Sequence, residues 1–160
     1  MNDAVIRKGR LEDLGPALSV WRAAETARRG GQPIGAVTER RMRGYTRRPG
    51  AFLFVADCGG EIVGMSLATP ATSRPRELCV VQMVFVLPER RGGGIGGRLL
   101  DATLAEARSR GYGRAQLWTR AADPRAAALY AGRGFVSSGH PESGELGEPI
   151  VRYERPLQGP

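Results

Sequence analysis

Lysine and histidine are scarce in this 160-residue sequence. Lys8 is the one lysine among 24 basic side chains, and His140 is the one histidine. The remaining basic residues are arginines, which are scattered along the chain and give a formal net charge of +8. Because they form neither a basic tail nor a run interleaved with aromatic residues, we expect a modest attraction for anionic ligands. Nucleic-acid binding is kept only as a minor alternative, and His140, in a Gly/Pro-rich stretch, is expected at the surface.

Cysteine is also rare, and long apolar runs are missing. Cys58 and Cys79 lie far apart and fit neither a metal-binding nor a C-x-x-C redox spacing, so we expect no metal site and a reduced protein. Cys79 lies in an apolar stretch and is expected to be buried and inert. No run approaches the ~18 residues of a membrane span, and residues 1–8 lack the apolar core of a signal peptide. These features predict a cytoplasmic protein that does not bind membranes.

The rest of the composition is that of an ordinary folded domain. Hydrophobic residues make up 41% and charged residues 25% of the chain. A chain of this length can bury a proper core, and we find no internal repeat and no linker. We therefore predict a single domain over residues 1–160.

Hydrophobic periodicity predicts an alternation of strands and helices. Apolar residues at helical spacing, or helix-start signals such as Asp123-Pro124, predict four helices, at 11–28, 38–48, 95–110 and 124–133. Apolar runs bounded by turn residues predict strands at 4–8, 51–56, 62–68, 78–86, 114–119, 135–138 and 150–154. The segment 140–149, rich in Gly, Pro and Glu, is predicted to be a loop. The fold class is thus α/β, with a mixed, mostly antiparallel sheet of about seven strands and four helices.

A glycine-rich turn follows the longest apolar strand. After Val86-Leu87-Pro88 come two arginines and then five glycines in six positions, before the next helix begins. Small side chains and the unpaired N–H groups of a helix start make a site for an anion such as a phosphate. A literal G-x-G-x-x-G between Gly92 and Gly97 suggests a dinucleotide site, but that site needs an acidic residue after the next strand, which ends in Trp118-Thr119-Arg120.

Two motifs resemble those of the GNAT superfamily of acyl-CoA-dependent N-acetyltransferases. The V-x-P and R/Q-x-x-G-x-G/A elements match at 86–88 and 91–96. A second element, N-x-x-A-x-x-L-Y-x-x-x-G-F, matches residues 123–135 except that Asp123 replaces the usual Asn. The order of the predicted elements also agrees over essentially the whole chain. The resemblance implies the GNAT fold with splayed central strands, and transfer of an acetyl group from acetyl-CoA to a primary amine by direct attack in a ternary complex.

The resemblance also implies where acetyl-CoA binds. Backbone groups of Val84, Phe85 and Val86 would pair with the pantetheine arm, and the Val86 N–H would hold the thioester oxygen as it gains charge. The pyrophosphate would accept hydrogen bonds from the backbone of the turn, at Arg91, Gly92, Gly93, Gly94, Ile95, Gly96 and Gly97. Asp123 can accept but not donate where the usual Asn does both, so its contact with the cofactor is left open; its helix-capping role needs no cofactor.

Two residues are candidates for proton transfer. Tyr130 matches the usual general acid of the family, which protonates the departing thiolate, and core packing is its alternative role. Glu77, at the head of the 78–86 strand, is the candidate base, acting through water. A solvated strand-end carboxylate is the alternative identity of Glu77, with the amine then reacting from its neutral fraction.

The acceptor is expected to enter opposite the cofactor, between the first two helices, the central strands and the last hairpin loop. The residues placed there are Trp21, Glu25, 30–35, Tyr45 and 140–148. Glutamates in these segments are candidates to attract a cationic amine, or are simply solvated: Glu25, Glu142, Glu145 and Glu148. The expected partners are acetyl-CoA and a small-molecule or peptide amine, with homodimerisation left open. A CoA-binding regulatory domain without turnover and a basic nucleic-acid binder are the competing readings.

Overall fold

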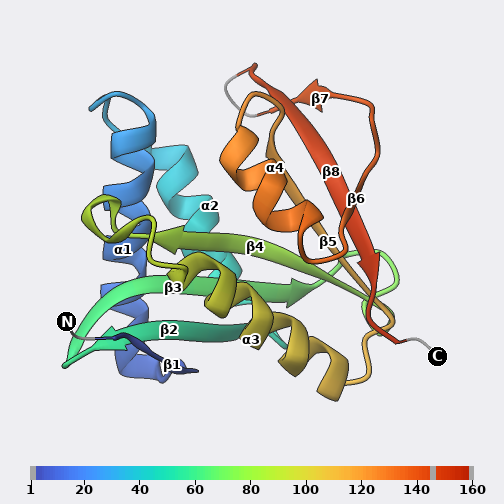
Figure 1. Ribbon diagram of the computed structural model, residues 1–160, viewed down its shortest axis with the longest axis horizontal. Coiled ribbons are helices and arrows are strands. Elements are labelled where there is room, and N and C mark those ends of the chain that lie inside the picture. Colours follow the sequence, from blue (N-terminus) through green and yellow to red (C-terminus); the bar gives the residue numbers. More distant parts are fainter. Residues whose placement is uncertain (1–2, 145–146, 159–160) are drawn as a thin grey trace.

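The strands in the described part of the chain join one sheet. The computed structural model describes residues 3–144 and 147–158, and over these ranges eight strands pair in the order β1-β2-β3-β4-β5-β8-β6, with β7 also on β8 (Figure 1). Four α-helices and two short 3-10 turns complete the described chain. The elements are β1 (Val5–Lys8), η1 (Leu11–Asp13), α1 (Leu14–Arg28), α2 (Ala36–Thr46), β2 (Phe52–Cys58), β3 (Glu61–Pro70), β4 (Leu78–Val86), η2 (Pro88–Arg90), α3 (Ile95–Ser109), β5 (Arg114–Arg120), α4 (Pro124–Ala131), β6 (Val136–Ser137), β7 (Glu142–Ser143) and β8 (Pro149–Pro156).

The predicted fold class is confirmed, with differences at a few element ends. The sheet is mixed, since β4 and β5 are parallel and the other pairs are antiparallel. The prediction that residues 140–149 are all loop is wrong, because Glu142 and Ser143 pair with the start of β8. The predicted first helix begins instead as η1, where the Asp13 carboxylate accepts hydrogen bonds from the Arg10 amide (2.7 Å) and from Arg7.

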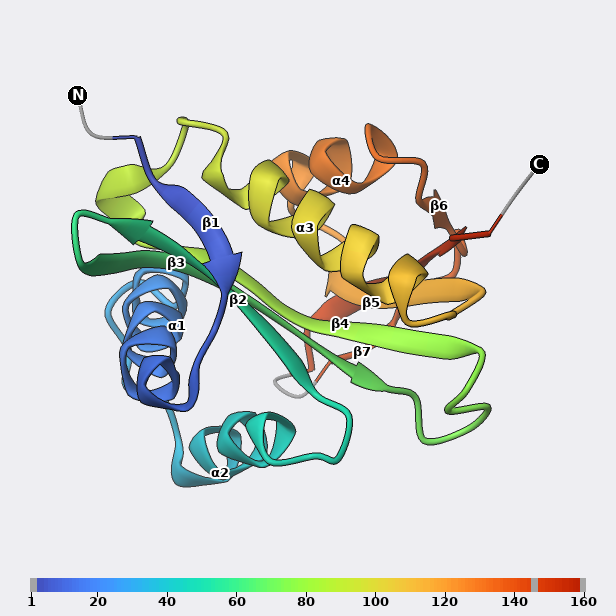
Figure 2. The ribbon, with the colours of Figure 1, turned by 90° about the horizontal axis from the view of Figure 1, so that it is seen from below.

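Helices cover both faces of the sheet. Figure 2 shows α1 and α2 on one face and α3 and α4 on the other. On α1 the stripe that faces the sheet contains Trp21, which has no exposed surface, and continues through Ala24 and Glu25, which are also buried. This spacing of three and four residues continues to Arg28, which is exposed at the C-terminal end of the helix.

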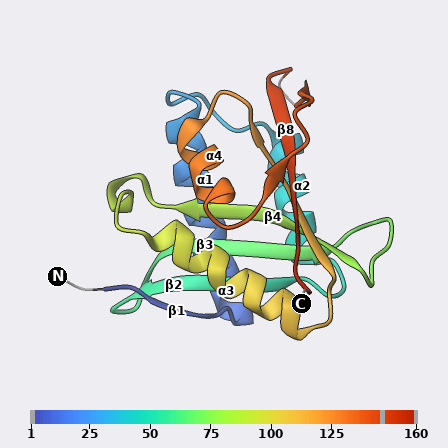
Figure 3. The ribbon, with the colours of Figure 1, turned by 45° about the vertical axis from the view of Figure 1, so that its right-hand side comes forward.

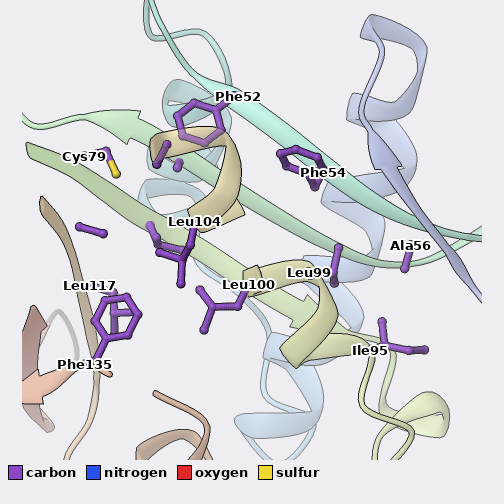
Figure 4. Packing of buried hydrophobic residues seen from close by; sticks show 14 of the residues in the cluster. Phe52, Phe54, Ala56, Cys79, Ile95, Leu99, Leu100, Leu104, Leu117 and Phe135 are labelled. Atoms are coloured by element: carbon purple, nitrogen blue, oxygen red, sulfur yellow. The ribbon is translucent and has the colours of Figure 1, made fainter. Parts of the chain in front are cut away.

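Helix α3 lies very close to the sheet. Leu99 and Leu100 have no exposed surface and point into a cluster that also holds Phe54, Leu117 and Phe135 (Figure 4). The close approach depends on Gly64 of β3: a Cβ there would lie 2.9 Å from Leu99 Cδ1 and 3.1 Å from Ile95 Cγ2. Inside this contact Ser66 and Thr103 form a buried hydroxyl pair at 2.6 Å.

The two central parallel strands, β4 and β5, separate along their length. β4 and β5 pair at Leu78 with Arg114, Cys79 with Ala115 and Val80 with Gln116. Beyond Val80, β4 stays on β3 as far as Val86, while β5 continues with β8. Figures 1 and 3 show β5 and β8 turned away from the direction of β2, β3 and β4. One edge of β4 is therefore left unpaired, among the described residues, over its C-terminal half.

Candidate functional site

The glycine-rich turn joins this unpaired half of β4 to α3. Gly92 and Gly94 have φ values of +87° and +79°, in the left-handed region that L-residues seldom adopt, and Gly94 is the N-cap of α3. Apart from the adjacent residues of the chain, no described protein atom lies within 4 Å of the position a Cβ would take at either residue. The glycines are thus required by the backbone path and by open space in front of it, and not by packing against the protein.

The amides of this turn are available to a ligand. The first bond of α3 to the turn runs from the Arg98 amide to the Gly94 carbonyl at 3.1 Å. Across 3–144 and 147–158, the amides from Gly92 to Gly97 have no acceptor. Since they lie at the positive end of a 15-residue helix, they form a site for an anion. Arg91 is exposed beside them, and Arg90 is tied to Glu61 at 3.6 Å.

The backbone of β4 offers further hydrogen-bonding groups next to the turn. The Leu87 amide donates to the Val63 carbonyl of β3 at 2.9 Å, and Val86 stands opposite Gly64. Because successive residues of a strand direct their backbone groups to opposite edges, those of Val86 and Val84 face the β5 side, where β4 is unpaired. The backbone groups of Phe85 face β3. Val84 and Val86 are thus the residues whose backbones border the gap.

Tyr130 lies on the short helix α4, on the other side of this gap. The Asp123 carboxylate accepts from the Ala126 amide at 3.0 Å, which confirms the predicted N-cap of α4. The Tyr130 ring packs against Phe135 and Tyr153, with centroids 6.0 and 5.9 Å away. Burial raises the pKa of Tyr130 to about 12, with a further rise from Asp123 and a decrease from Arg28. The phenol therefore holds its proton at neutral pH and can donate it.

Glu77 lies apart from these residues. It precedes β4, and its carbonyl accepts from the amides of Gly113 and Arg114, where β4 and β5 are still paired. Its side chain is 71% exposed and lies 3.9 Å from Arg74. The glycine turn follows the opposite end of β4, so the structure does not bring Glu77 together with the turn.

The expected acceptor residues are only partly where the sequence placed them. The prediction that Trp21 lines the acceptor entrance is wrong, because its side chain is fully buried against the sheet. Glu25 is also buried, and its two oxygens pair with Arg28 at 2.8 Å and Arg29 at 2.7 Å. Glu142 is exposed on β7, and Glu145 lies outside the described residues.

Three side chains near the gap were missed at the sequence level. Arg28 ends α1, while Trp118 and Arg120 lie on β5. Trp118 is 37% exposed, and the Arg152 guanidinium lies 6.0 Å from its ring centroid. The Nε of Arg120 is buried and has no hydrogen-bond partner within the described part of the chain. One sequence signal could have placed Trp118 and Arg120 on the same face of β5. Side chains alternate along a strand, and Leu117 between them lies in the core.

Neither cysteine forms a disulfide within the described residues, and both are buried, as predicted for Cys79. Burial raises the pKa of the Cys79 thiol to about 11, so it stays protonated. Within residues 3–144 and 147–158, no three His, Cys, Asp or Glu side chains gather as a metal ion would require. The same residues contain no helix whose length and apolar content would let it cross a bilayer.

Comparison with known proteins agrees with the motifs. The family model "Acetyltransferase (GNAT) family" matches residues 17–135. The uncharacterized N-acetyltransferase YjgM of Escherichia coli is 34% identical over 88 residues, 55% of this chain and 53% of that protein. N-acetyltransferase 8F1 of Mus musculus is 33% identical over 99 residues, 61% and 45% of the two chains. The matched stretch thus spans about half the length of these relatives.

A solved structure shares the whole fold. The putative acetyltransferase yncA from Salmonella typhimurium, solved with its cofactor acetyl-CoA, superposes with a TM-score of 0.79 over 98% of this chain and 95% of its own, at 19% identity. A family match over most of the sequence and a shared fold over nearly all of it lead to one assignment. The chain belongs to the acetyltransferase (GNAT) family.

Proposed function

We propose that the protein transfers an acetyl group from acetyl-CoA to a primary amine, by direct attack of the amine within a ternary complex. The observation that carries this proposal is that two sets of available backbone groups lie next to each other. The free amides of Gly92 to Gly97 suit the pyrophosphate, and the unpaired edge of β4 at Val84 and Val86 suits the amide-bearing pantetheine arm. Family membership and the acetyl-CoA complex of a relative with the same fold support the same cosubstrate.

In this proposal the Val86 N–H polarises the thioester carbonyl. The acceptor nitrogen forms a bond to the carbonyl carbon, and the oxygen gains negative charge that the N–H stabilises. Collapse of the tetrahedral intermediate breaks the carbon–sulfur bond and leaves a thiolate, which takes the Tyr130 proton. With its pKa raised to about 12, Tyr130 carries this proton at neutral pH, and solvent returns a proton to the phenolate after the transfer.

The amine must also lose a proton, and the structure favours water for that step. Glu77 remains the candidate base from the sequence, but its exposed position at the paired end of β4 and β5 leaves it far along the strand from Val86. We therefore propose that the amine enters as its neutral fraction, or loses its proton to solvent. Asp123 uses one carboxylate oxygen to cap α4, and we propose that the other is free to accept from the cofactor arm.

We also propose that residues 1–160 act as one catalytic unit in the reducing cytoplasm, in keeping with two cysteines that form no disulfide within the described residues. Light scattering on the purified protein would show whether it acts as a monomer or a homodimer.

Two measurements on the same protein test the function. Isothermal titration with acetyl-CoA should show saturable binding, and a thiol-release assay with a panel of primary amines should show amine-dependent CoA release. Binding without release for any amine would favour a regulatory CoA-binding domain. If neither occurred, and nucleic acid bound with an affinity that falls steeply with salt, the basic nucleic-acid reading would replace both.

A further inference from the structure

A group of charged side chains comes from three elements, the C-terminal end of α1, the end of β5 and the start of α4. Arg28 and Arg29 both pair with the buried carboxylate of Glu25, one on each oxygen. One carboxylate cannot neutralise two guanidinium groups, so this triad retains positive charge. Arg28 is the more exposed of the two cations, with 36% of its side chain accessible against 12% for Arg29.

Arg120 adds a further cation beside Arg28. Burial lowers the pKa of Arg28, and Arg120 lowers it further, while Glu25 and Asp123 raise it. The Nε–H of Arg120 is buried and, in residues 3–144 and 147–158, has no acceptor. Buried donors in folded proteins are nearly always satisfied, by protein, water or ligand. An anionic group bound to the guanidinium of Arg120 would lower the excess positive charge.

An apolar surface borders these cations. Trp118 lies two residues before Arg120 and therefore on the same face of β5, opposite to the buried Leu117. Its ring is 37% exposed, and it is held on one side by Arg152 of the neighbouring strand, its register partner. An indole next to two guanidinium groups suits a ligand with an anionic head and an apolar part.

The position of these groups relates them to the proposed reaction. Asp123 caps α4, the helix that carries Tyr130, and both Asp123 and Arg28 act electrostatically on the Tyr130 hydroxyl. Arg120 ends β5 in the part of the strand that has separated from β4. A ligand held by Arg120 thus lies beside the gap into which the thioester would project.

Building on the proposed function, we propose that the acceptor is a small amine that carries a carboxylate close to its amino group, as an amino acid does. Arg120 and Arg28 bind the carboxylate, and Trp118 contacts the apolar part. Arg28, Arg29 and Arg120 outnumber the two carboxylates that act on Arg28, and Arg152 beside Trp118 is a further cation. These carboxylates are those of Glu25 and Asp123. A carboxylate on the ligand lowers the excess positive charge, whereas a purely cationic amine would add to it. The expectation that Glu25 attracts a cationic amine is replaced, because both its oxygens are already paired.

The test compares matched amines in the thiol-release assay. The probes are the common amino acids and the corresponding amino amides, which keep the side chain and the amine but lose the carboxylate. We expect kcat/KM for the best amino acid to exceed that of its amide by at least about tenfold, the effect of a charge-assisted hydrogen bond. Amino amides have the less basic amine and hence more of the neutral nucleophile, so amine basicity alone would favour the amide.

Variants then tie the preference to the arginines. Arg120→Gln and, independently, Arg28→Gln should each reduce the amino-acid to amide ratio about tenfold or more, with an unchanged Kd for acetyl-CoA. Arg76→Gln, in the exposed loop between β3 and β4, is the matched control and should leave the ratio unchanged. Because Arg28 is partly exposed, Arg28→Gln should remain folded even if Arg120→Gln does not, so the test can still be made with Arg28→Gln.

The outcomes separate this proposal from the proposed function. The carboxylate-bearing acceptor would be overturned if amino amides release CoA as well as or better than the amino acids do. It would also be overturned if neither arginine variant changes the amino-acid to amide ratio. Both results would leave acetyl transfer intact. A loss of acetyl-CoA affinity in the arginine variants with the ratio unchanged would mean that these arginines bind the cofactor, which also overturns it. Absence of release with every amine would contradict the proposed function itself.

Discussion

Replacing Gly94 by alanine isolates the contribution of the left-handed turn to the proposed acetyl-CoA site. Gly94 has φ +79°, and an L-residue in that region costs about 1–2 kcal/mol. No atom lies within 4 Å of the new Cβ, so no steric clash inside the protein adds to this figure. About 1 kcal/mol shifts the midpoint of a domain this size by ~2–4 °C, so Gly94→Ala should lower the thermal midpoint by about 2–8 °C.

The same backbone strain at residue 94 can also weaken the binding of acetyl-CoA. If the free chain relaxes at residue 94 to avoid the left-handed conformation, the amides turn away and the bound state must restore them. The loss then appears in affinity, up to about 30-fold for 2 kcal/mol, with a smaller shift of the thermal midpoint. The loss of folding stability is measured by differential scanning fluorimetry without ligand, and the loss of binding free energy by isothermal titration with acetyl-CoA. The sum of these two losses should stay near 1–2 kcal/mol.

Gly93→Ala is the matched control in the same turn. Gly93 does not have a positive φ, and its nearest non-neighbouring atom to a Cβ is the Arg90 carbonyl oxygen at a comfortable 3.9 Å. Its unfolding free energy should change by no more than about 0.5 kcal/mol. The reasoning fails if Gly94→Ala matches the wild type in both midpoint and affinity, or if Gly93→Ala lowers the midpoint as much as Gly94→Ala does.

Three further substitutions have defined outcomes. Gly64→Ala would drive a methyl group into Leu99 and should cost about 1–3 kcal/mol in chemical denaturation; a wild-type midpoint would show that α3 does not need this close approach. Tyr130→Phe keeps the ring packing but removes the proton, so kcat should fall about 100-fold with an unchanged melting temperature, and unchanged turnover would end its role as general acid. Arg7 and the Arg10 amide hold the pKa of Asp13 at about 2, below its usual 3.8, so its stabilising effect is complete above pH 3.8 and is lost as the pH falls through about 2. Asp13→Asn should therefore destabilise the protein at pH 7 and progressively less between pH 4 and pH 2. A difference in unfolding free energy between the wild type and the variant that stays constant over that range would contradict the pairing.

Local signals in the sequence predicted the elements that depend on nearby residues. Asp123 followed by Pro124 defines the start of α4, because both the carboxylate cap and the missing amide act within one turn. The strand 78–86 has the predicted bounds, since a continuous apolar run fits the centre of a sheet covered on both faces. The turn from Gly92 to Gly97 could also be placed, because its glycines reflect a local backbone requirement.

Features that depend on distant parts of the chain could not be predicted in the same way. The two-residue strand β7 exists through pairing with β8, and its own sequence carries no strand pattern. Glu25 was expected to be an exposed charge, but two arginines of its own helix satisfy it and allow its burial. The electrostatic effect of Arg120 on Arg28 depends on how α1 packs on the sheet, which no local pattern encodes.

The most direct test of the account is a crystal structure of the protein with acetyl-CoA. The account predicts the pyrophosphate within hydrogen-bond distance of the amides from Gly92 to Gly97. It also predicts the pantetheine arm along the unpaired edge of β4, with the thioester oxygen on the Val86 N–H. A cofactor bound elsewhere, or a pyrophosphate held by side chains with the turn amides left in solvent, would contradict it.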